Sequence, residues 1–193
     1  MKAPSYNLQR VQEGYSRIAN ASLRASAPEA GGAPAKVTAE EVRTLFTAAR
    51  GSDKRMSVDE KVRLASEWGA LKGRADAGAL AEFKKLGARL NLPSPERLQG
   101  IRDSLRLKWG PQVDSPAPQL TVKQLQDAVA AGRNEKGQLD DASKFLLAYE
   151  FQAIPERSKS LEVKQEYARL QKELGLPLFT DGRRTDSKDL GVG

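Results

Sequence analysis

The stretch VTAEEVRTLFTAARGSDKRMSVDEKVRLASEWGAL at residues 37–71 aligns without a gap with LTVKQLQDAVAAGRNEKGQLDDASKFLLAYEFQAI at residues 120–154. One extra residue in the second copy restores the register, so that FKKLGARLNLP at 83–93 meets YARLQKELGLP at 167–177. Aromatic, apolar and charged positions agree along both stretches. Agreement over this length predicts that the chain carries an internal duplication.

Helix start signals recur at matching places of the two copies. In the pattern S/T-x-x-E/Q, two side chains satisfy backbone N–H groups that the first helical turn leaves unpaired. This pattern, or a single good capping residue, occurs at Thr38–Glu41, Ser57–Glu60, Thr121–Gln124 and Asp140. Each copy is therefore predicted to begin a helix at its start and another after its central loop.

Helix stop signals and apolar spacing complete the prediction of an all-α fold. Residues 91–93 and 175–177 each offer a residue that tolerates positive φ, then a leucine, then a proline that cannot continue a helix. Apolar residues recur at intervals of three and four between these signals, which places them on one helical face. The predicted helices span residues 7–24, 39–49, 58–72, 77–90, 95–109, 122–132, 141–154 and 160–174.

These elements predict two tandem diverged three-helix repeats, at 37–93 and 120–177, joined by a connecting helix and Pro-rich linker at 94–119. Residues 1–36 are predicted to form an amphipathic helix tethered by a flexible Ala/Pro/Gly linker. Residues 178–193 show no periodicity and are predicted to be a disordered tail.

The tethered helix provides the candidate binding site. Leu8, Val11, Tyr15 and Ile18 follow a heptad-like spacing of three and four residues, and Ser22 interrupts the stripe. Because this face has no evident place in the repeats, we expect it to dock on a partner protein.

The two central loops resemble degenerate EF-hand loops. Each connects two predicted helices and has an aliphatic residue, Met56 or Leu139, at the hydrophobic eighth position of such a loop. The resemblance implies calcium binding through ligand positions one, three, five, nine and twelve. These positions hold Ala49, Gly51, Asp53, Ser57 and Glu60 in the first loop, and Gly132, Asn134, Lys136, Asp140 and Ser143 in the second. Calcium takes six to eight oxygen ligands, so we expect capped turns without metal, with a calcium-responsive module as an alternative.

Composition narrows the possible chemistry. The chain of 193 residues has no Cys and no His, so thiolate sites and the commonest general base near neutral pH are missing. No phosphate-cradling glycine loop, nucleophile elbow or zinc-protease motif occurs. We therefore expect neither an enzyme nor a bound cofactor.

The formal net charge of +7 leaves a nucleic-acid-associated protein as a second alternative. Its candidate contacts are the basic residues of the connecting helix, Arg97, Arg102, Arg106 and Lys108, and base stacking on aromatic residues. These aromatic residues are Trp68, Phe83, Trp109, Phe145, Tyr149, Phe151 and Tyr167. Most of them align with an aromatic in the other copy, which favours a role in the core.

The sequence thus favours a non-catalytic helical interaction protein or a structural component of an assembly. No apolar run is long enough to cross a bilayer, and no secretory leader is evident, so we expect no membrane partner and a cytoplasmic location, or export by another route.

Overall fold

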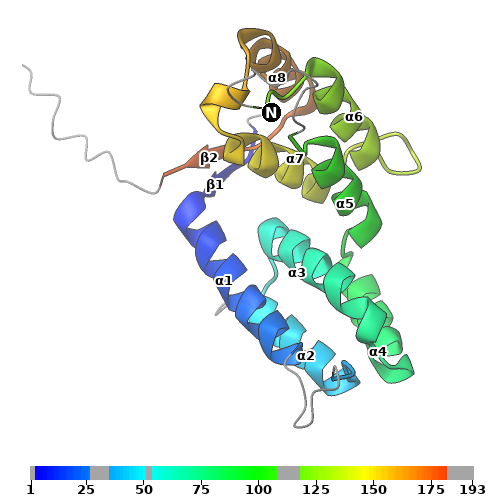
Figure 1. Ribbon diagram of the computed structural model, residues 1–193. Helices are drawn as coiled ribbons and strands as arrows, with labels where there is room; N and C mark the ends of the chain where they lie inside the picture. Colours follow the sequence, from blue (N-terminus) through cyan, green and yellow to red (C-terminus); the bar gives the residue numbers. More distant parts are fainter. Residues whose placement is uncertain (1–2, 27–34, 51–53, 108–117, 182–193) are drawn as a thin grey trace, which may run out of the picture.

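Helices and one short parallel sheet make up the fold (Figure 1). The computed structural model describes residues 3–26, 35–50, 54–107 and 118–181. Its elements in chain order are β1 (Ser5–Asn7), α1 (Leu8–Ala25), α2 (Ala39–Ala49), α3 (Val58–Leu71), the 3₁₀ turn η1 (Lys72–Arg74), α4 (Ala77–Leu90), α5 (Pro95–Ser104), α6 (Val122–Gly132), α7 (Asp141–Ala153), the 3₁₀ turn η2 (Glu156–Ser158), α8 (Leu161–Leu174) and β2 (Leu178–Thr180). The predicted all-α class is confirmed, apart from the two strands.

The predicted capping residues begin the helices. The Thr38 hydroxyl accepts from the Glu41 N–H at 3.4 Å, and the Glu41 carboxylate accepts from the Thr38 N–H at 2.7 Å. Thr121 and Gln124 form the same reciprocal pair at 3.1 Å in both directions. These pairs satisfy backbone donors that α2 and α6 would otherwise leave unpaired.

The predicted stops of α4 and α8 are also present. Asn91 and Gly175 follow the two helices in the left-handed conformation, with φ of 50° and 66°. The next residues close the ends, because the Leu92 N–H donates to Gly87 O at 3.0 Å and the Leu176 N–H donates to Gln171 O at 3.1 Å. Both ends thus have the backbone turn that the Asn/Gly-Leu-Pro pattern predicts.

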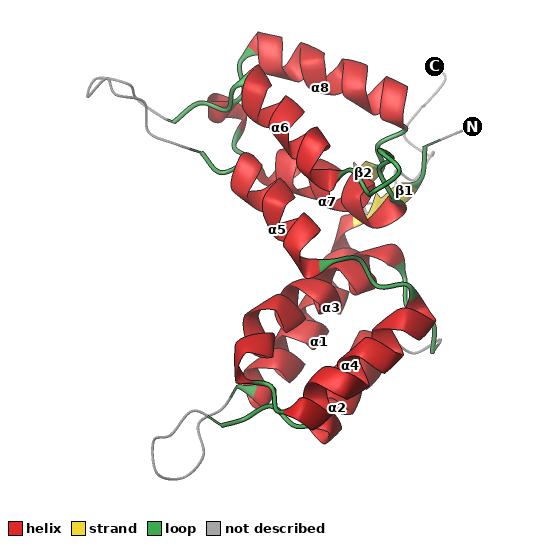
Figure 2. Cartoon of the chain, turned by 90° about the vertical axis from the view of Figure 1, so that its right-hand side faces the viewer, coloured by secondary structure: helices red, strands yellow, loops and turns green. Residues whose placement is uncertain are grey.

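The helices gather around two hydrophobic clusters. The first contains residues of α1 to α4, and we call these helices the first unit. The second is built mainly from α5 to α8, the second unit. Figure 2 shows the two units one above the other. Each consists of three helices, a 3₁₀ turn and a fourth helix. Duplication of one ancestral segment remains a prediction, which this shared order supports.

The structure contradicts the prediction that residues 1–36 form a tethered helix outside the repeats. Ile18 and Ala25 of α1 are buried in the first cluster, and Val11 is buried in the second. Helix α5 packs on α6 and α7 as α1 packs on α2 and α3. The first helix of each unit is therefore part of that unit, where the sequence predicts a tethered helix for α1 and a connecting helix for α5.

A parallel pair of strands joins the two ends of the described chain. Residues 5–7 of β1 pair in register with residues 178–180 of β2, and the Leu178 N–H donates to Pro4 O at 2.9 Å. This pair corrects the prediction that the chain is disordered from residue 178. Residues 182–193 of the predicted tail lie outside the described residues.

Helix α3 connects the two clusters. Leu64 and Trp68 point into the first cluster, and Val62 and Ala65 belong to the second. Helix α3 therefore contributes buried side chains to the hydrophobic clusters of both units. None of the described helices combines the length and the apolar character needed to cross a membrane.

Candidate functional site

The predicted partner-binding face of α1 is largely buried within the protein. Val11 is 2% exposed and Ile18 is fully buried. Tyr15 lies between the units, with its ring 5.3 Å from that of Tyr149, and burial raises the pKa of its phenol. Leu8 is partly buried at the first position of the helix. A face in these surroundings cannot receive a separate protein, so the structure overturns this prediction.

The EF-hand-like loops place their polar residues in helix caps. Asp140 accepts from the Ser143 N–H at 2.8 Å, and Glu60 accepts from the Ser57 N–H at 2.9 Å. Among the described residues, no group of three or more Asp, Glu, His or Cys side chains is placed to hold a metal ion. Gly51 and Asp53 lie outside those residues, so the calcium alternative is untested at the first loop.

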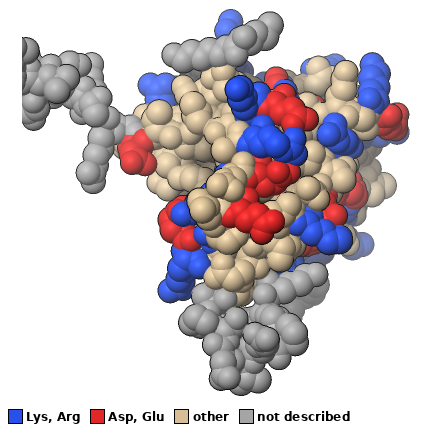
Figure 3. Space-filling view, turned by 90° about the horizontal axis from the view of Figure 1, so that it is seen from above, with Lys and Arg blue, Asp and Glu red and all other residues tan. Residues whose placement is uncertain are grey.

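The arginines of the predicted basic helix form ion pairs with acidic residues of the protein. Arg97 pairs with Asp140 at 3.0 Å, Arg102 with Glu150 at 3.3 Å, and Arg106 with Asp103 at 3.1 Å. On the face seen in Figure 3, basic and acidic side chains likewise lie side by side. Lys108 lies outside the described residues. This arrangement does not favour a phosphate-binding surface.

Each unit contains a stacked aromatic pair at the position that the alignment predicts. Trp68 stacks on Phe83 with ring centroids 4.2 Å apart, and Phe151 stacks on Tyr167 with centroids 3.8 Å apart. The first pair joins α3 to α4, and the second joins α7 to α8. Trp109, another candidate for base stacking, lies outside the described residues.

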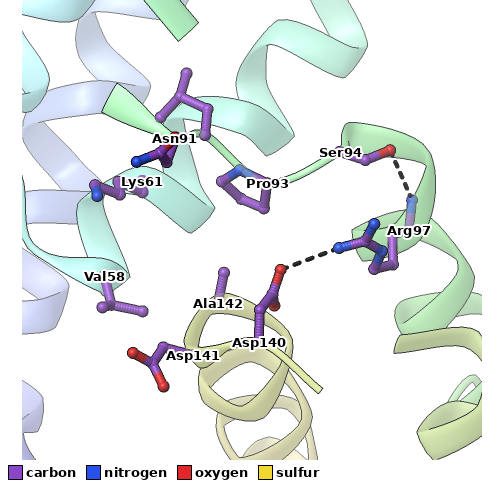
Figure 4. A pocket seen from close by; sticks show the side chains of 10 residues that line it. Val58, Lys61, Asn91, Pro93, Ser94, Arg97, Asp140, Asp141 and Ala142 are labelled. Carbon is purple, nitrogen blue, oxygen red and sulfur yellow. Dashed lines mark hydrogen bonds and ion pairs between the residues drawn. The ribbon is translucent and has the colours of Figure 1, made fainter. Parts of the chain in front are cut away.

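One cavity lies where three helices begin, at the junction of the units (Figure 4). It measures about 460 Å³ and is lined by the starts of α3, α5 and α7. Its charges are partly matched internally, because Arg97 reaches across to Asp140. The helix starts are satisfied by their own caps, Ser94 for α5 and Asp140 for α7. One ion pair and the helix caps of this junction cavity are thus satisfied within the protein.

A more apolar groove lies beside the stacked pair of the second unit, and we call it the α8 groove. It holds about 220 Å³ and is lined by Ala148, Phe151, Gln152, Lys159, Tyr167, Gln171, Pro177, Leu178 and Phe179. Leu178 is 50% exposed at this groove. Burial raises the pKa of the Tyr167 phenol, so this side chain stays neutral and presents an apolar ring at physiological pH.

One lysine is the charged group of the α8 groove. The Lys159 ammonium lies 4.5 Å from the centroid of the Phe151 ring and 3.1 Å from the carboxylate of Glu156. Hydrogen bonds from Lys164 and then Lys159 lower the pKa of Glu156. The groove thus combines an aromatic floor with a lysine that is paired with Glu156.

The first unit has a groove at the corresponding place, along α4. Phe83, Gly87 and Pro93 line it, and they align with Tyr167, Gln171 and Pro177 of the α8 groove. Here the chain continues directly into α5, so that Pro95 and Glu96 form part of the wall.

Reasoning from sequence did not identify the α8 groove, because its aromatic residues were assigned to the core. The exposed Leu178 beside Phe179, just after a helix stop, was the available signal. Comparison with family models gave no match, and neither did comparison with curated proteins or with solved structures.

Proposed function

We propose that the protein is a non-catalytic binding protein that docks an extended segment of a partner protein in the α8 groove. The observation that carries this proposal is the half-exposed Leu178 next to a groove floored by the stacked Phe151 and Tyr167. Protein interfaces are anchored by a few aromatic and aliphatic side chains that fill such pockets.

Strand β2 adds a backbone contact to the groove. In a parallel pair, alternate residues of a strand direct their N–H and C=O groups to the neighbour. The Leu178 N–H donates to the O of Pro4, the residue before β1, so the N–H and C=O of Phe179 point to the other side. The described sheet has two strands, which leaves this side of β2 unpaired within it. An extended segment can add there by strand pairing.

Charge defines the partner segment further. Lys159 lines the groove, and Lys159 and Lys164 share the single carboxylate of Glu156. An apolar side chain flanked by Asp or Glu therefore fits better than one flanked by Lys or Arg, because opposite charges speed and orient docking.

A peptide array tests this proposal on the full-length protein. Each peptide carries a central Leu or Phe, flanked by acidic, basic or neutral residues. We expect binding to the acidic set, weakened about tenfold or more in Leu178→Ser, which is a loss of roughly 1.4 kcal/mol. Leu161→Ser is the matched control, since Leu161 is 71% exposed at the start of α8 and lies outside the groove.

Two outcomes count against the proposal. Equal weakening by both substitutions would show that the groove is not the site. Absence of peptide binding, together with salt-sensitive binding of a single-stranded oligonucleotide, would favour the nucleic-acid alternative instead.

A further inference from the structure

A polar cleft lies on a different part of the molecule from the α8 groove. It is formed where β1 and the end of β2 meet the starts of α1 and α3, and it measures about 690 Å³. This volume is within the range of small-molecule sites. Six charged residues line it, Arg10, Glu13, Arg17, Arg55, Asp59 and Glu60, and Tyr6 adds a phenol. We call it the β1 cleft.

Asp59 is the unusual residue of this cleft. Its side chain lines the cleft although the residue is only 7% exposed. Within the described part of the chain, no hydrogen bond or ion pair reaches its carboxylate. Gly14 of α1 lies opposite, where an added Cβ would be 3.8 Å from Asp59 Oδ2. Because this carboxylate lines the cleft, its oxygens can accept hydrogen bonds from a cationic ligand.

The neighbouring acid does not share this property. Glu60 accepts from Arg17 at 2.9 Å and from the Ser57 N–H at 2.9 Å, so its charge is compensated. The pKa of the Tyr6 phenol is raised first by burial and then by the negative charge of Asp59. Asp59 thus differs from Glu60 in having no ion pair with a described residue.

Arg10 supplies the opposite charge at the cleft. It is exposed on the first turn of α1, and its guanidinium makes no hydrogen bond or ion pair with any described residue. A free guanidinium binds carboxylate groups by paired hydrogen bonds. The cleft therefore presents Asp59 and Arg10 to a ligand, beside the other charged residues Glu13 and Arg55 that line it.

We infer that the β1 cleft binds a small zwitterionic amine, with the ammonium group at Asp59 and the anionic group at Arg10. A free α-amino acid has this pair of charges. An ammonium group suits the site better than calcium, since it needs few acceptors whereas calcium takes six to eight oxygens. This inference does not depend on peptide binding in the α8 groove.

Calorimetric titration of the full-length protein tests the inference. The probes are the free α-amino acids, their decarboxylated amines and their N-acetyl derivatives. We expect one or more amino acids to bind, the matching amine to bind more weakly, and the N-acetyl form to bind least. Asp59→Asn should weaken binding of the amino acid and of the amine about tenfold or more. Glu162→Gln, which removes an acid from the first turn of α8, should change neither.

A second substitution keeps the test decisive if Asp59→Asn does not fold. Arg10→Gln should weaken the amino acid and leave the amine unchanged, because only the amino acid carries an anionic group. The inference is overturned if no amino acid binds the wild-type protein more tightly than about 10 mM. It is also overturned if a folded Asp59→Asn protein binds as the wild type does, since Asp59 would then serve only the start of α3.

Discussion

Gly175 shows how one residue ends a helix. It follows α8 with φ of 66°, a conformation in which a Cβ atom clashes with the backbone. Gly175→Ala is therefore expected to lower the free energy of unfolding by about 1 kcal/mol, measured by urea denaturation. Gly73→Ala is the control, because no atom lies within 4 Å of its added Cβ and its φ is not positive. A similar loss in both variants would contradict this reason.

The ion pair of Glu96 is expected to make the stability of the protein depend on pH. Hydrogen bonds, first from Lys72 and then from its own backbone and Ser94, lower the pKa of Glu96 to about 2, from a usual value of 4.5. A carboxyl with a lowered pKa in the folded state stabilises the protein above its unfolded pKa, and this contribution is lost as the pH falls.

We therefore expect the stability advantage of the wild type over Glu96→Gln to be present at pH 6 and to disappear between pH 4.5 and 2. Because the Glu96 side chain is 68% exposed, solvent screens it and the advantage should stay below about 1 kcal/mol. Glu135→Gln, at an exposed residue without an ion pair among the described ones, is the control. An advantage that stays constant down to pH 2 would exclude the ion pair as its cause.

At the scale of elements, the structure makes α1 part of the first unit. Ile18 is fully buried there, whereas Leu23 on the same helix is 67% exposed. Ile18→Ala should lower the free energy of unfolding by about 2–5 kcal/mol through lost burial and a cavity, and Leu23→Ala by less than about 0.5 kcal/mol. Chemical denaturation measures both effects. A small effect of Ile18→Ala would contradict the packing of α1 in the first unit.

Local signals in the sequence predict the helices well. Capping boxes, the Asn/Gly-Leu-Pro stops and apolar spacing depend on residues close in the chain, so the ends of α2, α4 and α6 agree with the prediction. The role of α1 depends on packing against α2 and α3. Ser22 interrupts its apolar stripe, yet Ser22 is itself buried, so the interruption was misleading.

The strands and the clefts could not be predicted in this way. Ser5–Asn7 and Leu178–Thr180 are short, and they pair across almost the whole chain, so no local pattern indicates them. The β1 cleft depends on this pairing, which brings β1 and the end of β2 beside the start of α3. Asp59 reads in the sequence as an ordinary acid in the first turn of a helix.

At the scale of the whole molecule, shared packing on α3 predicts cooperative unfolding. Leu64 and Val62 lie in different clusters, so the loss of one unit exposes apolar surface of the other. Thermal unfolding followed by the fluorescence of Trp68, in a Trp109→Phe background, should coincide with unfolding followed by circular dichroism. Two separate transitions would show that the units unfold independently.

The parallel pairing of β1 with β2 also decides how the molecule resists tension. Both strands run the same way, with the first residues of the described chain leading into β1 and its last residues leaving β2. A pull on the two ends therefore drags the strands past each other lengthwise, so that their hydrogen bonds carry the load together. Strands loaded in this direction separate at higher force than strands peeled apart one bond at a time. We therefore expect the β1–β2 pair to resist unfolding when the two ends are pulled.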